Sequence, residues 1–218
     1  MNRFDKTNLI AIEQAARAAV LDCLKKGFAN AKVKIEAKCQ DLVIDGLRQD
    51  PAYNSLLRGR LKSDFGLSDD IATGFLANLE ELLKSKIKSY FEPSNSKDTI
   101  AVIYLQILKL DLKEIWAIPQ SSYISESNRG NFEIHWARWL LMEGTRVVVS
   151  GFQTSKEGTS VVSRSGRGVI MLPSKDGAFR VHPSFAGSEQ SNLITRSALS
   201  NIDKIEQIFV NEILKIFR

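Results

Sequence analysis

The stretch that decides the fold lies between Trp139 and Leu199. It holds, in order, the segments Trp139-Leu-Leu-Met-Glu-Gly-Thr145, Ser163-Arg-Ser-Gly-Arg-Gly168, Phe179-Arg-Val-His-Pro-Ser-Phe-Ala-Gly187 and Asn192-Leu-Ile-Thr-Arg-Ser-Ala-Leu199. An apolar run stops at a charged turn, short strands follow around a glycine-rich basic loop, and the chain then re-enters a helix. The stretch has no known pairing of a nucleophile with a base and no metal-ligand spacing. The order of its parts therefore indicates an assembly role and not catalysis.

Strands are predicted on both sides of the basic loop. Residues 146–152 contain three consecutive valines, and β-branched residues favour strands. Residues 168–172 and 178–181 are expected to form a hairpin across the turn at 173–177, which ends in Asp-Gly.

Helices are predicted before and after these strands. Residues 132–142 suit a short amphipathic helix that ends at Gly144, and its Trp136 and Trp139 are three residues apart. An aromatic pair with this spacing is typical of a protein core or of the core of an interface. From Ser191 the apolar residues return to helical spacing, which predicts a long C-terminal helix packed on the sheet.

The first ninety residues are also expected to be helical, because apolar residues recur at three- and four-residue steps. Gly27 is expected to kink or end the first helix. Pro51 is expected to interrupt the helical structure at Asp50, because a proline disfavours the helical conformation of the residue before it. Ser68 can cap the next helix, whose first turn is acidic, and Pro93 is expected to close that helix.

Residues 100–107 have a period of two with apolar residues on both faces, which predicts a strand packed on both sides. Residues 121–131 are expected to be a polar loop. The sequence therefore predicts an α+β fold with a small mixed or antiparallel sheet. Its parts are a helical N-terminal region over 1–93 and an α+β core with the C-terminal helix over 98–218, as two domains or one integrated domain.

Composition sets wide bounds on function. The 218 residues include 30 basic and 25 acidic side chains, a net charge of +5 that is scattered along the chain. A dedicated nucleic-acid binder usually concentrates its charge on a helix or stripe. No segment resembles a signal peptide or reaches the length of a membrane span, so a soluble, unexported protein is expected.

The cysteines fit a reducing compartment. Cys23 and Cys39 are ~24 Å apart on one straight helix, too far for a disulfide. A hairpin bend near Gly27 would bring them closer, but we interpret them as reduced, buried thiols.

No catalytic residue, cofactor or metal is predicted. His135 is expected to pack beside the tryptophans, and His182 precedes a proline in a loop. Glu133 and Glu143 are ~15 Å apart on a helix, too far to act as an acid–base pair. Glu143 is expected instead to be a turn residue paired with a nearby arginine.

The basic loop at 163–168 lacks the lysine and the following helix of a phosphate-binding P-loop. Arg164 and Arg167 can still clamp an acidic partner or a nucleic-acid backbone. The alternative is a solvated hairpin tip. We favour a partner contact because the loop is long and polar between hydrophobic strands.

The segments between Trp139 and Leu199 resemble a family of tailed-phage proteins, the neck or minor tail-component proteins of the head–tail junction. In that family an aromatic-rich segment ends in a glutamate–glycine turn, as at Glu143-Gly144. Strands and an Arg/Gly-rich loop follow, and a proline–phenylalanine element, here 183–187, introduces the C-terminal helix. The resemblance covers about a third of the chain.

The resemblance implies a structural virion protein without enzymatic activity, assembled in the host cytoplasm, that forms a homo-oligomeric ring in the neck. Its position would be that of a connector, head-completion or tail-terminator protein. Expected partners are copies of itself, a portal, adaptor or head-completion protein, and tail tube or sheath terminator proteins, with loose contact to genomic DNA in the channel. The alternative is a nucleic-acid-binding or DNA-processing protein that uses the basic loop. The candidate interface residues are Arg164, Arg167, Trp139, Glu143, Phe185 and Arg196.

Overall fold

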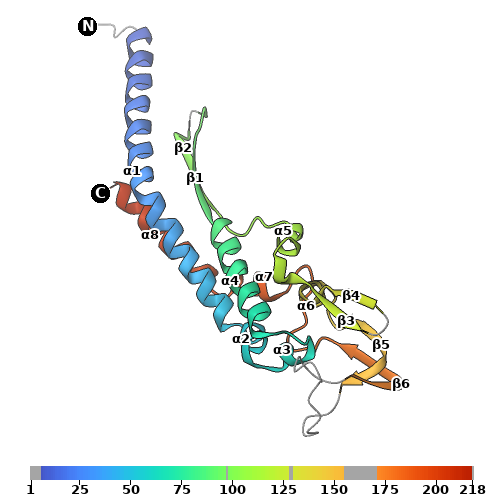
Figure 1. The fold of residues 1–218 in the computed structure, drawn as a ribbon. Helices are drawn as coiled ribbons and strands as arrows, with labels where there is room; N and C mark the ends of the chain where they lie inside the picture. The colour runs from blue at the N-terminus through green and yellow to red at the C-terminus, as the bar shows by residue number, and fades with distance from the viewer. Residues whose placement is uncertain (1–5, 97, 128–129, 155–170, 218) are drawn as a thin grey trace, which may run out of the picture. The chain divides into compact units, whose positions relative to one another are not determined.

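The computed structural model describes residues 6–96, 98–127, 130–154 and 171–217 (Figure 1). Its elements confirm the predicted α+β class. In chain order they are α1 (Lys6–Gln49), α2 (Pro51–Arg58), α3 (Arg60–Asp64), α4 (Asp69–Ser85), β1 (Lys88–Pro93), β2 (Ala101–Gln106), α5 (Leu112–Trp116), the 3-10 helix η1 (Pro119–Ser121), β3 (Tyr123–Ser127), β4 (Gly130–Ile134), α6 (Trp136–Met142), β5 (Val147–Thr154), β6 (Met171–Arg180), α7 (Leu193–Leu199), α8 (Ile202–Leu214) and the 3-10 helix η2 (Lys215–Phe217).

The chain forms two compact units, and neither is a single stretch of sequence. The first unit comprises residues 1–42, 86–109 and 202–218, and the second comprises 43–85 and 110–201. This division differs from the expected regions 1–93 and 98–218. The boundary between those expected regions, at 93–98, lies inside the first unit, in the connection between β1 and β2.

Helix α1 runs without interruption past Gly27, so the prediction of a helix end at this residue is wrong. The glycine has a packing role instead. A Cβ atom built on Gly27 would lie 2.3 Å from Cγ2 of Ile216 in η2. The missing side chain therefore gives the C-terminal segment room to approach the helix backbone.

The C-terminal helix is divided in two, where a single long helix was predicted. The break falls at Ser200 and Asn201, residue types that bond locally to backbone groups and disfavour a helix interior; Ser200 Oγ donates to the Ser197 carbonyl at 3.0 Å.

Helix α8 packs along α1 rather than on a sheet (Figure 1). Lys38 Nζ of α1 lies 2.7 Å from Glu212 Oε1, and Lys215 Nζ lies 2.8 Å from the same atom. Hydrogen bonds from Lys215 and Lys38 lower the pKa of the Glu212 carboxyl to about 2.

A β-hairpin stands where a helix was expected to continue to Pro93. Helix α4 ends at Ser85, and β1 pairs antiparallel with β2. Cross-strand partners Tyr90 and Tyr104 stack with ring centroids 5.1 Å apart, a pairing that local periodicity does not reveal. The strand predicted at 100–107 is confirmed as β2. The prediction that it is packed on both sides is wrong, since β2 belongs to a two-stranded sheet and Val102 is 48% exposed.

The remaining strands differ from expectation in their pairing. Within the described residues there are three separate two-stranded sheets instead of one. The predicted polar loop at 121–131 contains β3 and the start of β4. The hairpin predicted within 168–181 is wrong, because β6 is continuous and pairs with β5. Its predicted turn residues fall at a register shift between the pairs Phe152–Pro173 and Ser150–Ala178.

The core of the second unit is built around Trp136, which is fully buried. Its ring packs edge-on against Phe75 of α4, with the ring centroids 4.7 Å apart. The centroids of Trp136 and Phe65 are 5.7 Å apart. The indole Nε1 donates to the Gln120 carbonyl at 2.9 Å, so the polar end of the buried ring is satisfied. The prediction that the tryptophan pair belongs to a core is confirmed for Trp136; Trp139 is half-buried.

The cysteines are both free. Cys39 is buried, and burial raises the pKa of its thiol to about 11. Cys23 is exposed on α1, so the prediction of a buried thiol is wrong there.

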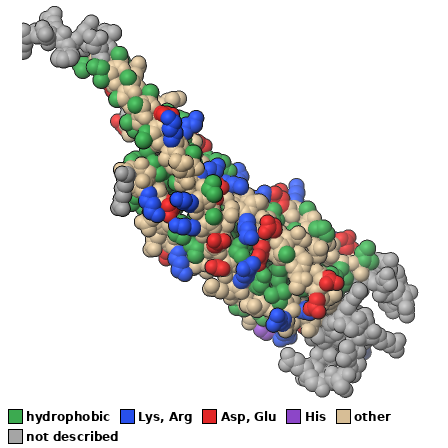
Figure 2. All heavy atoms as spheres, turned by 60° about the vertical axis from the view of Figure 1, so that its left-hand side comes forward, with side chains coloured by type: hydrophobic (Ala, Val, Ile, Leu, Met, Phe, Trp, Pro, Cys, Tyr) green, Lys and Arg blue, Asp and Glu red, His purple; other side chains and the backbone are tan. Residues whose placement is uncertain are grey.

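Hydrophobic side chains lie on the surface of the N-terminal part of α1 (Figure 2). They include Leu9, Ile10, Ile12 and Val20, each more than a third exposed. None of the helices in the described part of the chain has both the length and the hydropathy needed to cross a bilayer.

Candidate functional site

Three of the sequence segments that decide the fold meet at one place in the second unit, which we call the motif junction: Leu140, Gly144, Gly187 and Asn192. The amide of Gly144 donates to the Gly187 carbonyl at 2.9 Å, and the Gly187 amide donates to the Leu140 carbonyl at 2.9 Å. The turn after α6 is thereby tied to the segment that precedes α7. Gly144 has a φ of 59°, a conformation that favours glycine, which explains why α6 ends here as predicted.

Gly187 is in close contact with both neighbouring segments. A Cβ atom at this position would lie 2.8 Å from the Leu140 carbonyl oxygen and 2.7 Å from Cβ of Asn192. Both obstacles belong to ordered elements, the end of α6 and the cap of α7. The junction therefore requires a residue without a side chain.

We expect Gly187→Ala to destabilise the protein by about 1–3 kcal/mol, because the new methyl group displaces a backbone carbonyl or the α7 cap. Equilibrium denaturation followed by circular dichroism measures the change. Gly74→Ala is the matched control, since the nearest atoms to its methyl group belong to the flexible side chain of Gln120, at 3.2–3.3 Å. An equal loss in both variants, or no loss at Gly187, would contradict the assignment.

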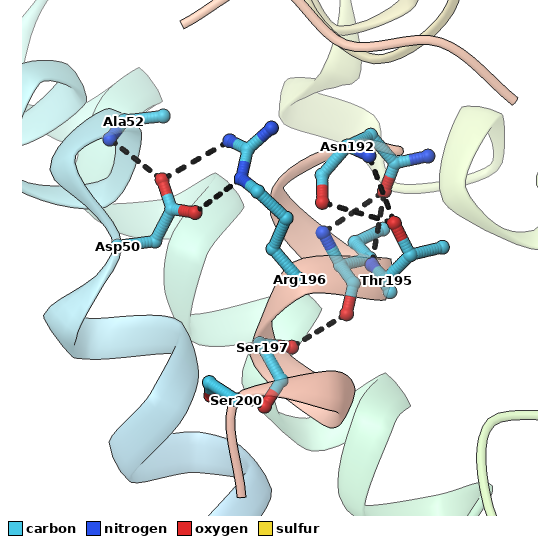
Figure 3. Close-up of polar contacts among 8 residues, drawn as sticks. Asp50, Ala52, Asn192, Thr195, Arg196, Ser197 and Ser200 are labelled. Carbon is cyan, nitrogen blue, oxygen red and sulfur yellow. Dashed lines mark hydrogen bonds and ion pairs between the residues drawn. The ribbon is translucent and has the colours of Figure 1, made fainter. Parts of the chain in front are cut away.

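Asn192 begins α7 with a reciprocal cap (Figure 3). Its side-chain Oδ1 accepts from the amides of Ile194 at 2.9 Å and Thr195 at 3.1 Å, and Thr195 Oγ1 accepts from the Asn192 amide at 2.8 Å. Asn192 Nδ2 also donates to the Ser188 carbonyl at 2.9 Å. These bonds fix the direction in which α7 leaves the junction.

One turn into α7, Arg196 forms a two-point ion pair with Asp50 (Figure 3). Arg196 Nε lies 2.8 Å from Oδ2 and Nη2 lies 3.3 Å from Oδ1. Asp50 Oδ1 also accepts from the Ala52 amide at 2.8 Å and so caps α2. The Asp50 side chain is only 6% exposed, so the carboxylate depends on these partners.

Glu143 has the role expected of it. Its Oε1 lies 3.5 Å from Arg138 Nε, and its Oε2 lies 3.8 Å from Arg146 Nη1. These arginines flank the turn at Gly144. The glutamate therefore links the first turn of α6 to the residue that precedes β5.

Two of the other expected site residues, Trp139 and Phe185, lie near the junction. Trp139 packs toward Phe65 with ring centroids 6.4 Å apart. Phe185 lies 5.8 Å from the His182 ring, in the turn that leads to Gly187. Arg164 and Arg167 lie outside the described residues.

His135 is exposed, so its predicted role in packing is wrong. It precedes α6 with a side chain 58% exposed, and its Nε2 lies 3.8 Å from Glu133 Oε2. His135 and Arg138 line a small surface pocket with Trp116 and Ser121. Across residues 6–96, 98–127, 130–154 and 171–217, no group of three or more His, Cys, Asp and Glu side chains is placed to hold a metal ion.

Sequence reasoning missed the residues that complete the junction. Asp50 was recognised only as a break, although an aspartate before a proline is a strong signal for a helix cap. Asn192 is also a favoured cap residue, and Thr195 three residues later can bond back to it. No sequence signal pairs Asp50 with Arg196, which is 146 residues away.

A second polar network in this unit was also missed. Glu80 Oε1 accepts from Arg48 Nε at 2.8 Å and from the Tyr53 hydroxyl at 2.8 Å, and its Oε2 accepts from Arg48 Nη2 at 2.6 Å. It joins α4 to α2 and to the last turn of α1.

No protein-family model, curated protein or solved structure matches the chain significantly.

Proposed function

We propose that this chain is a structural protein of a tailed-phage virion and forms part of the neck, assembling into a ring of identical subunits around the DNA channel. The observation that carries the proposal is the motif junction. Two of the segments that resemble the phage family, 139–145 and 183–187, are distant in sequence and make direct hydrogen bonds to each other in the fold.

The contacts at the junction support a role in positioning the helix ends and turns around it. Its polar side chains bond inward: Asn192 to the α7 amides, Arg196 to Asp50, and Glu143 to flanking arginines. Such an arrangement holds helix ends and turns at fixed angles, which a subunit needs if its copies are to close a ring by rotation. A connector, head-completion or tail-terminator protein works in this way.

The β5–β6 sheet supplies the proposed contact. Thr154 and Met171, the residues on either side of the segment 155–170, are partners in the ladder and lie at the same end of the sheet. This segment contains Arg164 and Arg167. We assign these arginines to an acidic surface on the neighbouring subunit or on an adjoining neck or tail protein.

Negative-stain electron microscopy tests the proposal, with the purified chain alone and mixed with phage portal and tail proteins. Closed rings are the expected result. The variant Arg164→Ala/Arg167→Ala is expected to lose ring formation, whereas Lys175→Ala, which removes an exposed cation from β6, is expected to retain it.

A chain that stays monomeric in all these mixtures contradicts the ring. Duplex DNA binding then separates the remaining alternative, because a nucleic-acid-binding protein must lose affinity steeply as salt rises. Binding of that kind without rings would replace the proposal by the DNA-binding function.

A further inference from the structure

The β1–β2 hairpin has two different edges. The Ser94 amide donates to the Ile100 carbonyl at 2.9 Å, which fixes the hydrogen-bonded positions of the ladder. Because these positions alternate, the amides of Ala101, Ile103 and Leu105 on β2 point away from β1. The Ser89 amide of β1 points outward in the same way, as its bond to Glu36 demonstrates.

The outer edge of β1 is blocked. Glu36 of α1 accepts from the Ser89 amide at 2.7 Å and from its hydroxyl at 3.2 Å. Pro93 occupies another outward position and has no amide hydrogen. Lys88 and Glu92 add charge to this strand. These are the devices by which proteins prevent edge pairing.

The outer edge of β2 has none of these devices. Among the described residues, β2 pairs only with β1. The strand reads Ala-Val-Ile-Tyr-Leu-Gln from Ala101 to Gln106 and contains no charge and no proline. An uncharged apolar strand with a row of unpaired amides and carbonyls is a template for another strand.

We propose that this edge binds β2 of a second copy of the chain in antiparallel orientation, with Ile103 on the two-fold axis. Ile103 then pairs with its own equivalent, and Ala101 pairs with Leu105 of the other copy. All of these are outward positions, so each pair exchanges both of its backbone hydrogen bonds. The two hairpins become one continuous four-stranded sheet.

Side chains favour this partner and this register. Val102 of one copy lies directly opposite Tyr104 of the other, and an aromatic residue opposite a β-branched residue is a stabilising cross-strand pair. The pairing covers Val102, which is 48% exposed in the single chain. No like charges meet, because the strand has none. The interface is self-complementary, as a two-fold contact requires.

The inference is independent of the proposed ring. It concerns the first unit, whereas the ring contact is assigned to residues of the second. A dimer through β2 without rings, or rings without this dimer, would separate the two proposals.

Amide hydrogen exchange measured by NMR on the full chain, from low to high protein concentration, tests the pairing directly. The amides of Ala101, Ile103 and Leu105 are expected to become protected as dimer forms. Those of Val102 and Tyr104 already bond to β1 and are expected to be protected at every concentration. Absence of self-association, or association without this alternating change, would overturn the proposal.

Val102→Lys provides a second test by analytical ultracentrifugation. It places two lysines near each other across the two-fold axis, and we expect dimer affinity to fall by about ten-fold or more. The matched control is Val210→Lys on α8, where the valine is 51% exposed. Equal affinity in the two variants would overturn the proposal, and the exchange pattern of the unaltered chain decides the case if Val102→Lys fails to fold.

Discussion

Replacing Trp136 by alanine is expected to destabilise the protein by about 3–5 kcal/mol, the range for removing a large buried aromatic side chain. The variant loses the edge-on contact with Phe75 and leaves a cavity between α4 and α6. It also leaves the Gln120 carbonyl without the donor it has now.

Urea denaturation followed by circular dichroism measures this loss without relying on tryptophan fluorescence. Trp139→Ala is the matched control, because the half-buried Trp139 lies on the same helix and leaves a smaller cavity. If Trp136→Ala lowers the free energy of unfolding by less than about 1 kcal/mol, this ring does not organise the core.

Arg196→Met is expected to cost about 3 kcal/mol, the lower end of the range for breaking a buried ion pair. The change leaves the Asp50 carboxylate, 6% exposed, with the Ala52 amide as its one remaining partner among the described residues. The lower end applies because Arg196 itself is 34% exposed, so water can enter where the guanidinium was.

A double-mutant cycle with Asp50→Asn isolates this pair. Asparagine keeps an oxygen to cap α2 and removes the charge, so Asp50→Asn/Arg196→Met should recover most of the stability that Arg196→Met loses. Strictly additive losses would indicate that the two side chains do not depend on each other.

The parts of the fold that the sequence predicted are those set by local chemistry. Asp50-Pro51 ends one helix and begins the next, and Ser68 stands before α4 with its hydroxyl 3.4 Å from the Ile71 amide. Gly144 ends α6 in a conformation that favours glycine. Each outcome depends on a few adjacent residues, so a reading of local patterns is sufficient.

The parts that were mispredicted depend on distant residues. Gly27 looks like a helix breaker until the approach of Ile216 is known. The residues before Pro93 continue a helical pattern but pair as a strand with β2. The candidate site divides in the same way: the pairing of Glu143 with flanking arginines was predictable, and the partner of Arg196 was not.

The interleaved order of the segments has a consequence for synthesis on the ribosome. All of the second unit has been translated once Asn201 is added, but the first unit still lacks the residues from Ile202 onward. Until those last residues emerge, the face of α1 that contacts Ile216 and Glu212 in the finished protein has no cover. Nascent chains stalled after Asn201 has emerged should therefore be held by chaperones more strongly than chains in which Glu212 and Ile216 have also emerged.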